Sequence, residues 1–89
     1  MKIKLELFGA SREFSIKDYL EFNVKEQLKI KDFRKEIISY LDINFKGNES
    51  FKKIVENSAF CSEDNNIIDD NYKIVKDQKI AIIPPIGGG

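Results

Sequence analysis

The stretch KIAIIP, residues 79–84, limits the fold of this 89-residue chain more than any other. Its nearly continuous apolar run predicts a strand buried on both faces, which makes it a central strand of a sheet. A proline has no N–H to donate to a neighbouring strand, so Pro84 and Pro85 should end the strand and hold the next residues extended. The sheet must therefore be built around a strand close to the carboxyl end of the chain.

The rest of the chain shows two different hydrophobic periods. Residues 2–8 and 19–25 alternate apolar and polar side chains, which predicts an antiparallel hairpin of half-buried strands with a long connection. Residues 30–41 repeat apolar side chains at spacings of three and four, which predicts an amphipathic helix. The polar face of this helix is interpreted as solvent-facing or, alternatively, as a docking face, and it carries Lys31, Arg34 and Lys35.

Less regular patterns follow the main helix. Ser50 is expected to cap a short second helix that runs to residue 57. Residues 58–62 predict a short buried strand, in which Cys61 is expected to be a small buried hydrophobe. The detailed structure of residues 45–57 and 63–74 stays open at this stage.

A central strand at the end of such a short chain must lie beside the first strand, and we expect it to be parallel to that strand. With one main helix across a face, this order predicts an α+β protein with a mixed sheet of the β-grasp, or ubiquitin-like, type. We assign residues 1–85 to this domain and residues 86–89 to an extended tail.

Composition excludes several classes of function. The 15 Lys and Arg balance the 15 Asp and Glu, so no net field favours binding to a nucleic acid or a membrane surface. No apolar run approaches the roughly 20 residues of a membrane-spanning helix, and the first residues do not form the apolar block of a signal peptide. With no His and a single Cys, the usual zinc sites and Ser-His or Cys-His nucleophile pairs cannot form. We expect a cytoplasmic protein with no metal site.

The tail is the candidate functional segment. Gly87, Gly88 and Gly89 have no side chains and can enter a narrow channel, and the terminal carboxylate is ionised at neutral pH. Such a carboxylate can attack the α-phosphate of ATP in another protein's active site. The chain has no phosphate-cradling G-x-x-x-x-G-K-[ST] motif, so we expect it to bind no cofactor and to catalyse nothing alone. The alternative is a frayed terminus without a function.

Phe8 should point outward at the end of the first strand, because three inward-facing positions precede it in alternation. It could join Ile82 or the two prolines in an apolar patch around the tail, and such patches often mark a partner interface. The alternative is that the loop after Phe8 covers it.

Four stretches together resemble one family: AIIPPIGGG, the preceding YKIVKDQKI, LFGASREF at the end of the first strand and IKDFRKEI on the helix. They are similar to the small subunits of molybdopterin synthase, in the MoaD/ThiS group of ubiquitin-like sulfur carriers. The resemblance implies that Gly89 is adenylated by a partner similar to ubiquitin-activating enzymes, which uses ATP, and is converted to a thiocarboxylate. A cysteine desulfurase is the kind of sulfur donor implied.

The resemblance also implies the later steps and the binding residues. The sulfur is donated to cyclic pyranopterin monophosphate in molybdenum cofactor biosynthesis, within a heterotetramer of two small and two large catalytic subunits. The residues implied to bind partners are Gly88, Gly87, Ile86, Pro85, Pro84 and Phe8.

Three alternatives stay open. One is a sister carrier for thiamine or cysteine biosynthesis. The second is a ubiquitin-like modifier that forms an isopeptide bond with a lysine. The third is a β-grasp interaction module that carries nothing.

Overall fold

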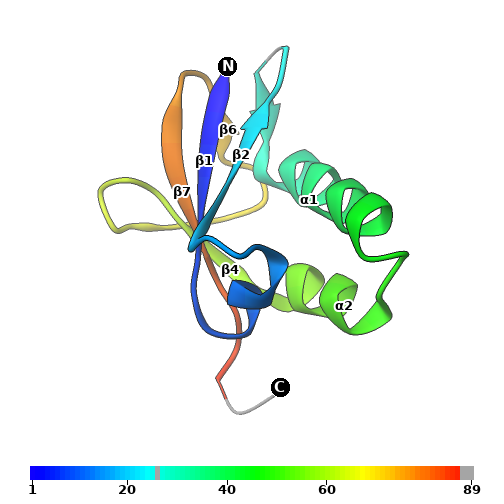
Figure 1. The fold of residues 1–89 in the computed structure, drawn as a ribbon. Helices are drawn as coiled ribbons and strands as arrows, with labels where there is room; N and C mark the ends of the chain where they lie inside the picture. The colour runs from blue at the N-terminus through cyan, green and yellow to red at the C-terminus, as the bar shows by residue number, and fades with distance from the viewer. Residues whose placement is uncertain (26, 87–89) are drawn as a thin grey trace.

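The computed structural model describes residues 1–25 and 27–86 (Figure 1). Its elements in chain order are β1 (Lys2–Leu7), the 3-10 helix η1 (Gly9–Phe14), β2 (Tyr19–Asn23), β3 (Leu28–Lys29), α1 (Ile30–Asn44), α2 (Glu49–Asn57), β4 (Ala59–Cys61), β5 (Ile67–Ile68), β6 (Lys73–Ile74) and β7 (Gln78–Ile83). None of the helices in the described part is long and apolar enough to cross a bilayer.

The main sheet has five strands in the order β2-β1-β7-β4-β5, while β3 and β6 form a small second sheet. β1 and β7 are parallel, and the other pairs of the main sheet are antiparallel. The last strand therefore lies at the centre, beside the first, as predicted. A mixed sheet of this order with α1 packed across one face is a β-grasp, which confirms the predicted fold class.

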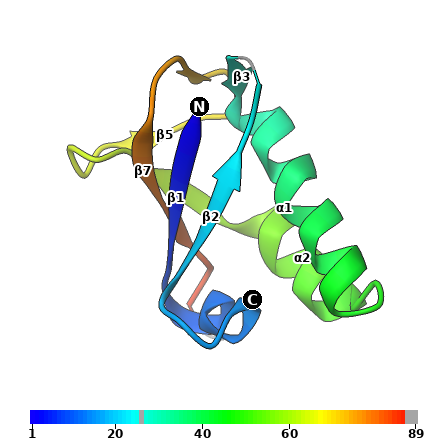
Figure 2. The ribbon, with the colours of Figure 1, turned by 45° about the horizontal axis from the view of Figure 1, so that its top comes forward.

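All helices lie on the same side of the main sheet (Figures 1 and 2). The core between the helices and the sheet is formed by apolar side chains of the helices and of strands β1, β2, β4, β6 and β7, which the structure buries completely or nearly so: Ile3, Leu5, Leu7, Phe14, Leu20, Ile30, Phe33, Ile37, Leu41, Val55, Phe60, Ile74, Ile80 and Ile82. The predicted stripe of α1 is thus confirmed as its buried face.

The central strand β7 is buried on one face only. Ile80 and Ile82 have no exposed surface, whereas Lys79 and Ile83 are exposed. The prediction of burial on both faces is therefore wrong. The reason is that no described element covers the outer face of the sheet, so even its central strand alternates between core and solvent.

The amino end of α1 is capped by the main chain of a distant segment. Ile30 N–H donates to the carbonyl of Tyr72 (2.9 Å), and Lys31 N–H donates to the carbonyl of Asp70 (3.1 Å). Lys29, the residue before the helix, makes no side-chain cap. The segment between β5 and β6 therefore satisfies donors that a capping side chain satisfies in other helices.

The short helix α2 begins two residues earlier than the sequence predicted, at Glu49. The side chain of Asn48 accepts a hydrogen bond from Phe51 N–H (3.1 Å), so Asn48 is the cap and Ser50 lies inside the first turn. The predicted cap at Ser50 is wrong, because a capping side chain reaches the N–H group three residues later and Asn48 has that geometry here.

Candidate functional site

The candidate site is the edge of the sheet at which β1 and β7 both end. Their parallel register pairs Leu7 with Ile82, so the carboxyl ends of the two strands lie side by side. Beyond them Pro84 is buried, Pro85 is exposed and Ile86 is completely exposed. The chain therefore leaves the body of the domain at Pro85, immediately after an anchored residue.

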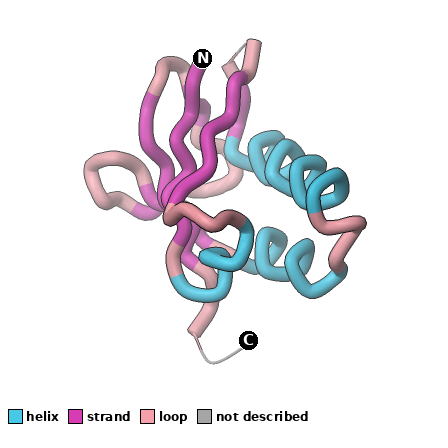
Figure 3. Tube along the Cα trace, viewed as in Figure 1, coloured by secondary structure: helices cyan, strands magenta, loops and turns pink. Residues whose placement is uncertain are grey.

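The turn that follows β1 lies beside the end of β7 (Figure 3), and Pro84 packs against this turn at Gly9. Gly9 in this turn has φ +55°, and a Cβ built on it would lie 3.8 Å from both Cδ and Cγ of Pro84. That separation is ordinary contact, so the backbone angle, which side chains rarely adopt, is what favours glycine here. The ring of Pro84 thus rests on η1.

Ser11 holds this turn together. The residue is completely buried, and its Oγ accepts a hydrogen bond from Phe8 N–H (3.0 Å) and donates one to the Phe8 carbonyl (2.6 Å). Ser11 N–H donates to the same carbonyl (3.2 Å). The sequence analysis missed Ser11, although a serine three residues after a strand end is a known local turn signal.

Phe8 points outward, with 47% of its surface exposed, so η1 does not cover it. Ile82, its expected partner, faces the core instead. The next residue, Ile83, is 37% exposed and pairs with Ala59 of β4. We call Phe8, Ile83 and Ala59 the outer patch, since they follow one another across the outer face where the tail leaves.

A groove of about 360 Å³ lies where the chain leaves the domain, on the side opposite the outer patch. η1, α2 and the two prolines line it, through Ala10, Ser50, Lys53, Ile54, Asn57, Pro84 and Pro85. Lys53 is exposed and brings a positive charge to this groove. A partner that encloses the tail would therefore meet an apolar patch on one side and a partly polar groove on the other.

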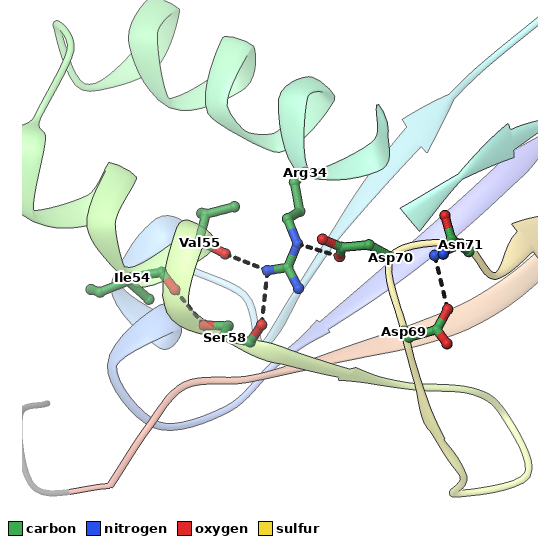
Figure 4. A network of polar contacts seen from close by, with 7 residues as sticks. All are labelled: Arg34, Ile54, Val55, Ser58, Asp69, Asp70 and Asn71. Carbon is green, nitrogen blue, oxygen red and sulfur yellow. Dashed lines mark hydrogen bonds and ion pairs between the residues drawn. The ribbon is translucent and has the colours of Figure 1, made fainter. Parts of the chain in front are cut away.

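Arg34 does not belong to a docking face. Its Nη1 donates to the carbonyls of Val55 (2.7 Å) and Ser58 (2.8 Å), and its Nε donates to Asp70 Oδ1 (2.9 Å), as Figure 4 shows. The guanidinium also lies 4.7 Å from the ring centre of Phe60. The docking alternative is wrong for Arg34, because its donors bind the end of α2 and the segment that caps α1.

Cys61 is half-buried, which differs from the expected full burial. It pairs with Ile67 of β5 and Ala81 of β7. The alternation of β4 turns Phe60 to the core and therefore Cys61 to the outer face. Within residues 1–25 and 27–86, no three acidic, His or Cys side chains gather as a metal site requires.

The predicted site residues are thus partly placed. The structure brings Phe8, Pro84, Pro85 and Ile86 to one edge of the sheet, while Gly87, Gly88 and Gly89 lie outside the described residues. The roles of all seven, and the division at residue 85, stay predictions.

No protein family model and no curated protein sequence matches the chain. Several solved structures are similar to it, among them two that align with nearly the whole chain. A protein assigned as molybdopterin converting factor, subunit 1, from Pyrococcus furiosus has a TM-score of 0.68 at 18% identity, covering 96% of this chain and 98% of that one. SAMP1 from Haloferax volcanii has a TM-score of 0.69 at 13% identity, covering 100% of both chains. At these identities the likeness concerns the fold, and it agrees with an α+β β-grasp with a mixed five-stranded sheet and a main helix.

Proposed function

We propose that this protein is a sulfur carrier whose terminal Gly89 is activated as an acyl adenylate and then holds sulfur as a thiocarboxylate. The observation that carries the proposal is the exit of the chain. β7 is fixed between β1 and β4, Pro84 is anchored on η1, and two residues later Ile86 is completely exposed. A rigid domain that the chain leaves in this way, just before three glycines, is suited to deliver the terminal carboxylate into a partner.

The chemistry needs no catalytic group of this chain. The ionised carboxylate attacks the α-phosphorus of ATP bound by an activating enzyme, and pyrophosphate leaves. The terminal sulfur of a donor persulfide then attacks the acyl carbon and AMP leaves. A thiol reductant cleaves the resulting acyl disulfide with two electrons, which releases the thiocarboxylate and the donor thiol. ATP is bound by the activating partner, an enzyme similar to ubiquitin-activating enzymes, and the sulfur comes from a donor such as a cysteine desulfurase.

The finer proposal is that the carrier is the small subunit of molybdopterin synthase. One similar structure is assigned as molybdopterin converting factor, subunit 1, and the IPPIGGG tail supports the same reading. The carrier would then work in a heterotetramer of two small and two large subunits and donate its sulfur to cyclic pyranopterin monophosphate. Phe8, Pro84, Pro85 and Ile86 are the described residues that this large subunit would contact.

The test is the intact mass after incubation with the activating enzyme of the same organism, ATP and a sulfur donor. We expect a gain of roughly 16 Da, because one oxygen of the terminal acyl group is replaced by sulfur. The matched control lacks Gly89 and should fold equally well without gaining mass. Conjugates on a denaturing gel, with no gain in mass, would show a protein modifier instead. If neither product forms with a competent enzyme, the chain is an interaction module and the proposal is wrong.

The client is tested separately. The thiocarboxylate form, mixed with the large subunit and cyclic pyranopterin monophosphate, should return to the carboxylate as molybdopterin forms. If sulfur transfer occurs only to a thiamine or cysteine precursor system, a sister pathway replaces the finer proposal.

A further inference from the structure

The turn after β1 contains a buried polar residue that the proposed chemistry does not use. Ser11 has no exposed surface, and its hydroxyl both accepts from and donates to the main chain of Phe8. Because both hydrogen-bonding capacities serve one residue, the hydroxyl fixes the place where β1 ends and η1 begins. An apolar side chain could fill the space of the Ser11 side chain, but it would make no hydrogen bonds to the main chain of Phe8.

The same turn supports the last anchored residue of the tail. Gly9 lies between Phe8 and Ser11 in sequence, and a Cβ built on Gly9 would point at the ring of Pro84 from 3.8 Å, so this side of the turn faces the proline. Ala10 lines the groove together with Pro84 and Pro85. Because proline fixes its own φ, the position of the Pro84 ring sets the direction of the chain that follows.

We propose that Ser11 is a positioning residue: through the Phe8 and Gly9 backbone it holds η1 as a rigid seat for Pro84, and so fixes the direction in which the tail leaves. This inference rests on the proposed function, because the direction matters only if a partner takes in the tail. A tail that samples many directions is competent for only part of the time, and its apparent affinity falls by that fraction.

The experiment compares Ser11→Ala with Ser15→Ala in the activating reaction, followed as ATP–pyrophosphate exchange with the activating enzyme of the same organism. Ser15 is a matched control, because it follows η1 directly and its Oγ accepts only a local bond from Lys17 N–H (3.1 Å). Ser11→Ala removes both hydrogen bonds to Phe8, and we expect the KM for the carrier to rise about two- to tenfold with kcat unchanged, as it would if the competent fraction of tails fell to between about a half and a tenth. Ser15→Ala should change neither constant.

A role in stability alone is distinguished by a double-mutant cycle with Pro84→Ala. If Ser11 acts through Pro84, the rise in KM of the double variant should be smaller than the product of the two single rises. If the two rises multiply, Ser11 acts elsewhere and the proposal is wrong. Should Ser11→Ala fail to fold, Gly9→Ala tests the same seat, since an alanine at φ +55° strains the turn while its Cβ meets Pro84 only at ordinary contact distance.

A second readout needs no partner. The NOE between the α-protons of Gly9 and the ring protons of Pro84 should be strong in the native protein, weaken in Ser11→Ala and persist in Ser15→Ala. If the NOE is as strong in Ser11→Ala as in the native protein, the seat does not depend on Ser11. If the NOE depends on Ser11 but the native protein shows no exchange activity, the proposed function is wrong, while the role of Ser11 in placing Pro84 is confirmed.

Discussion

Removing the side chain of Arg34 should destabilise the domain more than any other change of a charged residue. The guanidinium joins three elements that are distant in sequence: α1, the end of α2 and the segment around Asp70. Its side chain is only 19% exposed, so water replaces little of what is lost. Val55 lies in the last turn of α2, where its carbonyl has only a long hydrogen bond from Ser58 N–H (3.5 Å), and Ser58 directly follows the helix, so Arg34 supplies the shorter hydrogen bonds at this helix end.

The magnitude follows from these contacts. Asp70 is 54% exposed, so its ion pair contributes about 0–1 kcal/mol. The two bonds to carbonyls are made by a charged donor at a shielded site, where such bonds contribute about 1.5–3 kcal/mol each before the protein relaxes. Allowing for relaxation and for water that reaches the freed carbonyls, Arg34→Ala should lower the free energy of unfolding by about 2–4 kcal/mol. That is a large part of the roughly 4–13 kcal/mol expected for a domain of this size.

Urea unfolding followed by circular dichroism measures this loss. Lys35→Ala is the matched control on the same helix, because its ammonium lies 4.0 Å from Asp32 in an exposed pair, and it should change stability by less than about 0.5 kcal/mol. Arg34→Lys keeps the charge, but its ammonium group cannot reach the three acceptors at once. Its loss of unfolding free energy should therefore be more than half of the loss in Arg34→Ala. If Arg34→Lys is as stable as the native protein, charge near the end of α2 is sufficient and the reasoning from bond geometry is refuted.

Three other perturbations have distinct expected outcomes. Asn48→Ala should cost about 1 kcal/mol in urea unfolding and Ser50→Ala close to nothing, because only Asn48 caps α2, and equal costs would contradict this assignment. Phe60→Ala should cost about 3–5 kcal/mol in the same assay, since the ring is completely buried, and a loss below about 1 kcal/mol would show that the core refills the cavity. Ile83→Asp should raise the KM for the carrier in the activating reaction by at least about tenfold, because it puts a charge into an apolar contact, whereas Ile67→Asp at the far edge of the outer face should leave this KM unchanged. Equal effects of the two substitutions would show that the outer patch does not contact the activating enzyme.

Part of the site could be predicted because it depends on local pattern. The alternation of β1 correctly directs Phe8 outward, and the two prolines correctly end β7, since both effects arise between chain neighbours. It could not be predicted that Ile83, and not Ile82, faces outward near Phe8, because this depends on the register between two strands about 75 residues apart, which pairs Leu7 with Ile82.

The sequence by itself determined the periodic elements and their order. Two half-buried strands, a helix with one apolar stripe and a final apolar strand leave few ways to bury the core, and a central last strand beside the first is the way the chain takes. The physical reason is that the spacing of apolar side chains sets which face of each element must leave water.

Only the tertiary structure decided how polar groups are satisfied where elements end. The main-chain carbonyls of Asp70 and Tyr72 cap α1, and Arg34 donates to the carbonyls at the end of α2. These partners come from residues that the pattern of hydrophobicity does not relate to one another. A main-chain donor or acceptor at the end of a helix or strand can bind any group of opposite kind that lies within hydrogen-bonding distance. Because these groups come from distant parts of the chain, folding and not the local sequence brings them together.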